Sequence, residues 1–318
     1  FAGSTTYAFS LIVSAFILGL AAGGHVAAQI VDRVTDRRGL LAGVLLAVAL
    51  ASALLTPLLG ELPLLLLEPL AAVDGFRATQ TLVFSVLLGI VLLPTSLLGA
   101  VYPIATRLLA PDPATAPEAV GRAYAANTAG AVLGSLGTGL VLLPLLGLQD
   151  SLWLASTVFA LAAGLLLAER RRLALALPAL FALGAVATPD WNPRHMNLAP
   201  HIYGKDLVAN PAALAQMRDS GSVLMHREGR GATVTVLQRP DGARVLRING
   251  KTGASTHEDR MTQAWIGRLP AVLAERATDV FVLGLGSGMS LAPLLERADL
   301  TRLQVAELLP EVAEAAHA

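Results

Sequence analysis

The segment DVFVLGLGSGMSLAPLLERADLTRLQVAEL, residues 279–308, has the order of a strand, a glycine-rich turn, a helix and a second strand. Gly284, Gly286 and Gly288 follow the first apolar run, where glycine allows a sharp turn and lets a ligand approach without meeting a Cβ atom. The helix expected from MSLAPLLERA would offer free N–H groups at its N-terminus. Glu307 lies 19 residues after Gly288 (307 − 288), where an acid accepts hydrogen bonds from ribose hydroxyls. The segment predicts a nucleoside- or nucleotide-binding α/β domain; the alternative is a glycine-rich turn without a ligand.

Two further elements are expected just before this segment. In residues 232–250, β-rich runs flank the turn sequence RPDG, which predicts a β-hairpin. In residues 256–276, Met261, Trp265, Leu269 and Leu273 recur every four residues, which predicts one face of a helix that Pro270 kinks or divides. After the segment, Pro310 is expected to open another helix.

The composition of the whole chain is that of a membrane protein. The 318 residues are 54% hydrophobic and only 14% charged, against about 25% in a typical soluble domain. Residues 1–187 hold 9 Lys+Arg and 9 Asp+Glu, which leaves 14 of each for residues 188–318 from totals of 23 and 23. Both parts are formally neutral, so no nucleic-acid partner is expected. Without cysteine there is no disulfide or thiolate site, and the six scattered histidines lack metal-ligand spacing.

The first part contains several apolar stretches near the ~20 residues that cross a bilayer. We expect five or six transmembrane spans, at residues 7–31, 40–60, 81–102, 124–146 and 152–168, with a weaker one at 173–187. The arginine-bearing loops after the first, third and fifth spans, the last with the sequence ERRR (169–172), are expected to face the cytoplasm. A sixth crossing would place the C-terminal domain outside. We therefore favour a segment 173–187 that is re-entrant or interfacial, which leaves the C-terminal domain in the cytoplasm. Two alternatives stay open: an additional span at residues 62–73, or a C-terminal domain outside the cytoplasm.

Few residues within the spans suggest chemistry. Gly130 and Gly134, with Gly137 and Gly139, have the small-residue spacing that allows close helix packing, within one chain or between the two chains of a homodimer. His25 is ionisable but lies within two turns of Asp32 and Arg33, which favours a position at the membrane interface over a functional one. No pair of intramembrane carboxylates is present, which argues against an ion-coupled transporter.

These observations give a multi-domain fold class: an α-helical transmembrane bundle, a small β-hairpin region and the start of a Rossmann-like α/β domain. The expected domains are 1–187 (bundle), 188–222 (linker or docking segment), 223–255 (β-hairpin region) and 256–318 (incomplete Rossmann-like nucleoside-binding domain). Because the chain opens on Phe and has no basic segment before its first apolar run, we interpret it as part of a longer protein and not as one with a signal peptide.

Several sequence motifs resemble known enzymes. VLGLGSGMS with AELLPEV resembles the S-adenosylmethionine-dependent methyltransferase superfamily, and REGRGATVTVLQ, RVLRINGKTGAST and TQAWIGRLPAVL resemble the spermidine synthase (polyamine aminopropyltransferase) family. YAANTAGAVLGSLGTGLVLLPLLGL and VDRVTDRRG are similar to integral-membrane proteins in which a half-transporter-like bundle is fused to a spermidine synthase domain. The resemblance implies an integral protein of the cell inner or plasma membrane.

The resemblance assigns the nucleoside-binding role to Gly284, Gly286, Ser287, Gly288 and Glu307. It implies decarboxylated S-adenosylmethionine or S-adenosylmethionine as a cosubstrate, methylthioadenosine as a product, and no tightly bound cofactor or metal. The polyamine side departs from the family, because Ser287 and Asn249 replace acids, Gly253 replaces Gln, and Thr262-Gln263-Ala264 replace Tyr-His-Glu. The family's catalytic base would follow Ala318, so catalytic residues stay unassigned.

Three functions remain open from the sequence. The first is a membrane-anchored aminopropyltransferase acting on an amine. The second is a membrane-bound methyltransferase acting on a lipophilic acceptor, which the loss of acceptor-side charges favours. The third is a transporter or sensor regulated by a nucleoside.

Overall fold

The computed structural model describes residues 6–110, 112–167, 171–219 and 221–317, and these divide into two compact units. One unit holds the chain up to Leu62 and from Ala72 to Trp191. The other holds Pro63–Ala71 and the chain from Asn192 onward. The boundary near residue 191 lies four residues after the end of the last helix of the first unit, at Ala187.

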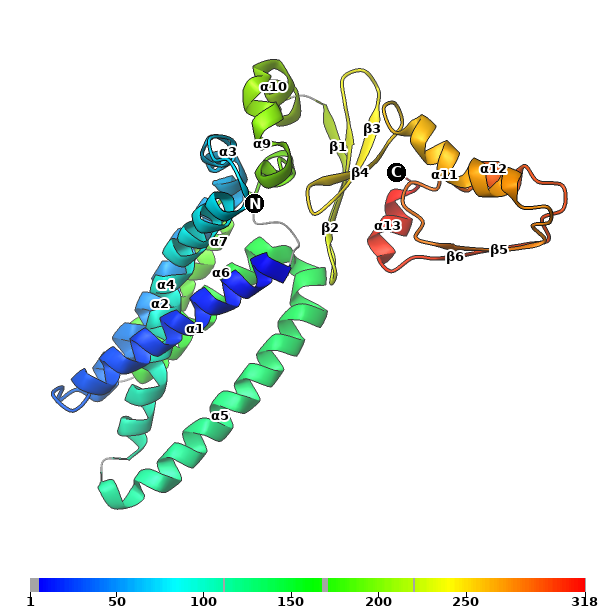
Figure 1. The fold of residues 1–318 in the computed structure, drawn as a ribbon. Helices are drawn as coiled ribbons and strands as arrows, with labels where there is room; N and C mark the ends of the chain where they lie inside the picture. The colour runs from blue at the N-terminus through cyan, green and yellow to red at the C-terminus, as the bar shows by residue number, and fades with distance from the viewer. Residues whose placement is uncertain (1–5, 111, 168–170, 220, 318) are drawn as a thin grey trace. The chain divides into compact units, whose positions relative to one another are not determined.

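Long apolar helices make up the first unit, coloured from blue to green in Figure 1. In chain order they are α1 (Thr6–Ile30), α2 (Arg37–Leu65), α4 (Phe76–Leu109), a 3-10 turn (Pro113–Thr115), α5 (Ala116–Gly137), a π-helical stretch (Thr138–Leu142), α6 (Leu143–Leu166) and α7 (Arg171–Ala187). Four described stretches are long and apolar enough to cross a membrane: Thr6–Ile30, Arg37–Ala71, Phe76–Leu109 and Ala116–Leu166. The chain therefore has the helices of a membrane protein, and four candidate spans replace the five or six expected.

The difference in number arises from two places in the chain. The fourth stretch is 51 residues long and runs through both spans predicted at 124–146 and 152–168. Gly147 (φ 77°, ψ 179°) interrupts its helical geometry in the gap between those two. The sixth prediction corresponds to the shorter apolar helix Ala174–Ala187. The alternative span at 62–73 is not separate, because the end of α2 and the short helix α3 (Leu67–Ala71) occupy it.

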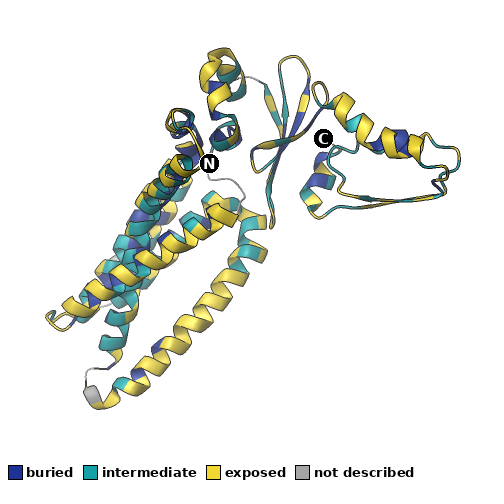
Figure 2. Cartoon of the chain, viewed as in Figure 1, coloured by how far each residue is buried: buried dark blue, intermediate teal, exposed yellow. Residues whose placement is uncertain are grey.

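Close helix packing occurs between α1 and α4. Gly19 and Gly23 of α1 lie against Thr95 and Ser96 of α4, and Gly99 of α4 lies against the backbone of Leu20, so closely that a Cβ atom at any of these glycines would overlap its neighbour. The glycines predicted to pack closely, on the other hand, face open space: no atom comes within 4 Å of a Cβ built at Gly130 or Gly134. Figure 2 shows α5 exposed along most of its length.

An ion pair joins two of the loops predicted to be cytoplasmic. Arg107, at the end of α4, lies 2.6 Å from Asp32, which follows α1. Both loops therefore lie at one end of the first unit, as the predicted alternation requires. The side of the membrane they occupy stays a prediction, and of the ERRR loop, Glu169 and Arg170 lie outside the described residues.

The predicted hairpin is confirmed and is part of a larger antiparallel sheet. Its strands are β1 (Ser222–Glu228), β2 (Thr233–Gln238), β3 (Arg244–Ile248) and β4 (Lys251–Ser255), paired in chain order. The RPDG sequence forms the β2–β3 turn, in which Gly242 has φ 84° and Asp241 accepts a hydrogen bond from the Ala243 N–H at 2.9 Å. Asn249 (φ 51°) and Gly250 (φ 80°) form the tight β3–β4 turn that this residue pair favours.

The segment 188–222, predicted as a linker or docking segment, is largely helical. It forms α8 (Pro193–Met196), α9 (Pro200–Ala209) and α10 (Pro211–Asp219), and each helix begins with a proline. A proline in the first helical position has no N–H to leave unpaired, so proline is well suited to start each of these helices. Buried Leu198 and Leu207 pack against Leu67 of α3 and hold α9 in place.

The antiparallel sheet is covered on both faces. Because side chains alternate along a strand, Val234, Val236 and Leu246 face one side, where they pack against Val312 and Ala315. Thr235 and Arg247 face the other side, where both contact Asn197 between α8 and α9. The sheet thus separates two environments, one facing the C-terminal segment and one facing α8–α10.

The C-terminal segment contains a parallel pair of strands. Its elements are α11 (Arg260–Leu273), β5 (Asp279–Leu283), α12 (Ala292–Leu295), β6 (Arg302–Ala306) and α13 (Pro310–Ala315). β5 pairs with β6 in parallel, with Asp279 opposite Arg302 and Leu283 opposite Ala306. Pro310 opens α13 as predicted. The described chain shows this two-stranded sheet here, and a complete Rossmann-like domain is not shown.

One expectation about the helices in this segment is wrong. The helix after the glycines is one turn long and begins at Ala292, four residues after Gly288, so its N-terminus is not at the glycine loop. α11 continues through Pro270 to Leu273 without dividing. The apolar face of α11 is exposed within the described chain: Met261, Trp265, Leu269 and Leu273 are each more than half exposed. Small residues, Gly267 and Ala271, make the buried contacts.

The carboxyl group of Glu258 is expected to make the stability of the antiparallel sheet depend on pH. The Ser255 hydroxyl donates to its carboxylate at 2.6 Å, and the Arg239 guanidinium lies 2.6 Å away. The bond from Ser255, the backbone N–H of Glu258 and Arg239 lower the pKa of this carboxyl to about 2. Since the pKa is lower in the folded state than the ~4.3 of an unfolded glutamate, the stabilisation is present above that value and is lost as the pH falls toward 2.

We expect the Glu258→Gln variant to show a smaller fall in Tm than the unmodified chain between pH 5 and pH 3. Both chains are compared by thermal unfolding in the same detergent. An equal fall in the two chains would show that the carboxylate of Glu258 does not contribute to the acid sensitivity.

Candidate functional site

The glycine loop between β5 and α12 has the backbone conformation that its sequence suggested. Gly284, Gly286 and Gly288 have φ of 91°, 55° and 75°, which L side chains rarely adopt. The Gly284 N–H donates to Ala306 O at 2.7 Å, and the Gly288 N–H donates to Leu285 O at 2.9 Å. No atom lies within 4 Å of a Cβ built at Gly284 or Gly286. The loop therefore exposes its backbone to open space, as close approach by a ligand requires.

Glu307 lies beside this loop, immediately after β6. Its Oε2 accepts a hydrogen bond from the Leu285 N–H at 2.7 Å, and its Oε1 accepts one from the Leu309 N–H at 3.0 Å. Burial raises the pKa of this carboxyl, but the N–H groups of Leu309, Leu285, Gly286 and Leu308 outweigh burial and leave the pKa below its ordinary value. The carboxylate is therefore held ionised. Of these N–H groups, Leu285 and Leu309 form the hydrogen bonds given above, one to each oxygen, so the second lone pair of each oxygen can accept a further donor such as a ribose hydroxyl.

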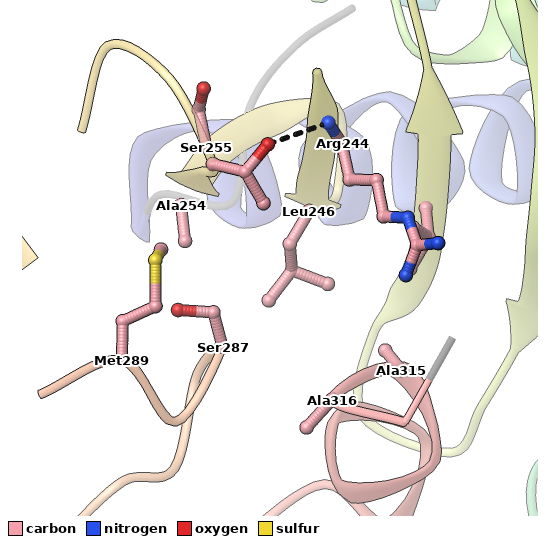
Figure 3. A pocket seen from close by; sticks show the side chains of 10 residues that line it. Arg244, Leu246, Ala254, Ser255, Ser287, Met289, Ala315 and Ala316 are labelled. Atoms are coloured by element: carbon pink, nitrogen blue, oxygen red, sulfur yellow. Dashed lines mark hydrogen bonds between the residues drawn. The ribbon is translucent and has the colours of Figure 1, made fainter. Parts of the chain in front are cut away.

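Ser287 faces a small cavity on the other side of the loop. The cavity has a volume of about 130 Å³ and lies between the antiparallel sheet, the glycine loop and α13. Figure 3 shows Ser287 and Met289 on one side, Ala254 and Leu246 on the sheet, and Ala315 and Ala316 below. The Ser287 hydroxyl is buried and has no hydrogen-bond partner among the described residues. At about 30 Å³ per water molecule, the space suits a small acceptor group and not a nucleoside.

The chemistry of the cavity is apolar and hydroxylic. Its lining includes Ser255, Thr256 and Ser287 as hydroxyl donors and Arg244 as a cation, and it contains no carboxylate. The backbone N–H of Arg244, and not its guanidinium, donates a hydrogen bond to the Thr256 hydroxyl at 2.9 Å, which is the bond drawn in Figure 3. The sequence did not point to Arg244, Thr256, Met289 or the α13 alanines, because they come from distant segments that only the packing of α13 on the sheet brings together.

The other acceptor-side positions do not reach this cavity. Asn249 is part of the β3–β4 turn, and its Oδ1 accepts a hydrogen bond from the Thr233 N–H at 2.9 Å. The side-chain amide of Gln263 donates to Gly253 O at 3.3 Å and so joins α11 to β4. Thr262 and Ala264 are likewise absent from the lining. Of the residues that the resemblance assigns to the acceptor, Ser287 alone lines it.

No metal site is found in the part of the chain that the structure describes, where no group of three or more His, Asp or Glu side chains is placed to hold an ion. Comparison with models of known protein families gives no match, and a search of curated proteins gives none either. The functional argument therefore rests on the geometry of the glycine loop, Glu307 and the cavity.

Proposed function

We propose that this is a membrane-anchored transferase related to the fused spermidine synthases, with a nucleoside cosubstrate bound at the start of a Rossmann-like domain. The observation that carries the proposal is the pairing of the open glycine loop with the ionised carboxylate of Glu307 at the end of the neighbouring parallel strand. The backbone of Gly284 and Gly286 would approach the sugar and sulfur end of the nucleoside, and Glu307 would accept bonds from the ribose hydroxyls.

In the proposed reaction, a neutral amine attacks the carbon next to the sulfonium of decarboxylated S-adenosylmethionine. A new carbon–nitrogen bond forms, the carbon–sulfur bond breaks, methylthioadenosine leaves, and the amine loses a proton to a base. The described residues contribute positioning: Glu307 and the loop hold the nucleoside, which converts the encounter into a reaction between aligned groups. Ser287 would meet the acceptor, because its unpartnered hydroxyl faces the cavity beside the loop.

A second function, methyl transfer from intact S-adenosylmethionine, is favoured by the lining of that cavity. A diamine is a dication, and burial of its charges requires anionic or aromatic partners. The cavity offers Arg244 and no carboxylate, so a neutral or apolar acceptor fits it better than a diamine does. The two functions share the nucleoside site and differ in the acceptor and in the group transferred.

The experiment that tests the proposal is isothermal titration of the chain in lipid nanodiscs with methylthioadenosine, decarboxylated S-adenosylmethionine and S-adenosylmethionine. We expect saturable binding of at least one of these, with adenine as the non-binding control. Mass spectrometry of native membranes supplied with putrescine then separates the two functions: an aminopropylated product supports the synthase, and preferred binding of intact S-adenosylmethionine without such a product supports methyl transfer. Absence of binding by all three compounds would rule out a nucleoside site.

A further inference from the structure

A second, larger cavity lies on the opposite face of the antiparallel sheet. It has a volume of about 350 Å³, within the ~300–1,000 Å³ usual for sites of small molecules. Leu237, Val245 and Arg247 line it from the sheet, whereas the even-numbered neighbours Val236 and Leu246 line the cavity at the glycine loop. Because side chains alternate across a strand, the two cavities are on different faces. Ser255, at the end of β4, is the one described residue that lines both cavities, and the glycine loop and Glu307 are not part of this lining.

Arg247 is the unusual group in this cavity. Its residue is only 8% exposed, and it forms no ion pair among the described residues. Nη1 donates to Asn197 O, Nη2 contacts the Met217 sulfur at 3.7 Å, and the guanidinium carbon lies 5.9 Å from the centre of the Tyr203 ring. Nε is buried with no partner. A buried cation ordinarily needs a counter-charge, and a thioether is a weak acceptor, so the hydrogen-bonding capacity of Arg247 is not met by the protein.

Two other arginines line the same cavity. Arg194 donates to Gly221 O at 2.6 Å through Nη2, while its Nε is buried without a partner. Arg239, by contrast, is neutralised by Asp241 at 2.9 Å and Glu258 at 2.6 Å. Of the three arginines that line the cavity, Arg247 therefore has no carboxylate partner among the described residues, and Arg194 interacts electrostatically with Asp219.

The charge of the lining distinguishes between classes of anion. Arg239 is already paired with Asp241 and Glu258, so the lining cation that no described carboxylate neutralises is Arg247. One such cation matches a monoanion. A phosphate monoester, with a charge close to −2 at neutral pH, would meet the two carboxylates with an uncompensated charge.

The uncharged residues of the lining indicate the chemistry of the part of the ligand that carries no charge. Tyr203, Met217, Leu237 and Val245 supply apolar and aromatic surface. The Tyr203 hydroxyl accepts a bond from the Thr252 N–H at 3.1 Å, and no acceptor for its own proton is found among the described residues. It can therefore donate to a ligand oxygen.

We propose that this cavity binds a small monocarboxylate with an apolar body. The carboxylate displaces the Met217 sulfur from Arg247, pairs with Arg247 and Arg194, and accepts a bond from the Tyr203 hydroxyl. The body lies against Met217, Leu237 and Val245. The exchange is favourable because a carboxylate oxygen is a far stronger acceptor for a guanidinium than a thioether is.

Titration of the chain in detergent micelles with phenylacetate tests this proposal, with phenylacetamide as the neutral analogue and inorganic phosphate as the competing anion. We expect saturable binding of phenylacetate at millimolar concentration or below, and at least about 10-fold weaker binding of phenylacetamide, because a hydrogen bond to a charged group is worth about 1.5–3 kcal/mol. Arg247→Met should weaken phenylacetate binding by about 10- to 150-fold on the same ground. Arg302→Met, which removes an exposed cation from β6, is the matched control and should leave it unchanged.

Variants that keep Arg247 separate an effect on ligand binding from an effect of the Arg247→Met substitution on folding. Met217→Leu removes the competing sulfur at similar volume and should strengthen binding several-fold, whereas Tyr203→Phe should weaken it by about 2- to 10-fold, the equivalent of one neutral hydrogen bond. Far-ultraviolet circular dichroism confirms that each variant is folded. No saturable binding of phenylacetate, or equal binding by Arg247→Met, would overturn the proposal. Tighter binding of phosphate than of phenylacetate would overturn the assignment of a carboxylate.

Discussion

Gly99→Ala is expected to destabilise the transmembrane unit by about 1–3 kcal/mol, the usual cost of forcing extra volume into a tightly packed contact. A Cβ at Gly99 would overlap the backbone of Leu20 in α1, and backbone cannot move aside as the end of a flexible side chain can. α1 and α4 would have to separate, with loss of the contacts that Gly19 and Gly23 make with Thr95 and Ser96. Unfolding of the purified chain in mixed micelles, followed by circular dichroism, measures the change.

Gly89→Ala is the matched control for this prediction. It lies on the same helix, the substitution is the same, and no atom comes within 4 Å of the new Cβ. The free energy of unfolding should be unchanged or raised by up to ~1 kcal/mol, because alanine has a higher helix propensity than glycine. Equal stability of the Gly99→Ala and Gly89→Ala variants would show that the α1–α4 contact is not tight.

Glu307→Ala is expected to weaken nucleoside binding by at least about 10-fold. The variant loses a charged acceptor for the ribose, worth about 1.5–3 kcal/mol, and it also removes the bonds that hold the Leu285 and Leu309 N–H groups. The loop would lose the anchor that sets its position beside β6. Isothermal titration with methylthioadenosine measures the loss.

Glu314→Ala provides the comparison for Glu307→Ala. Glu314 is a carboxylate of α13 that pairs with Arg227 at 3.3 Å on the surface, an interaction of small energy. Its removal should leave nucleoside binding unchanged. Glu307→Gln separates the two roles of Glu307, because an amide oxygen can still accept one backbone bond but carries no charge. If Glu307→Ala binds methylthioadenosine as tightly as the unmodified chain does, Glu307 does not hold the ribose. This conclusion does not depend on the result for the second cavity.

Local signals in the sequence predicted some elements well. The Asp-Gly and proline signals located the β2–β3 turn and the start of α13, because they depend on φ values that only a few residues adopt. The two apolar runs on either side of the glycines and the expected helix correctly predicted the strands β5 and β6. The apolar composition likewise indicated membrane helices, since the length of a span follows from bilayer thickness.

Other predictions failed where packing decides between alternatives that are locally alike. Small-residue spacing is present in both α1 and α5, but α4 packs against the glycines of α1 and leaves Gly130 and Gly134 open. The four-residue period of α11 predicted one apolar face of a helix, and the packing leaves Trp265 and Leu269 of that face exposed in the described chain. Periodicity shows which residues share a face, but it does not show what lies opposite.

The sequence by itself determined the membrane character, the glycine loop and the position of Glu307, because each follows from the properties of residues close together in the chain. The tertiary structure alone decided which residues line the two cavities. Arg244 and Arg247 are three residues apart on β3, yet they line opposite faces of the sheet. Val234, Val236 and Leu246 face α13, whereas Thr235 and Arg247 face α8–α10. The identity of those covering elements depends on contacts between distant segments that no local pattern encodes.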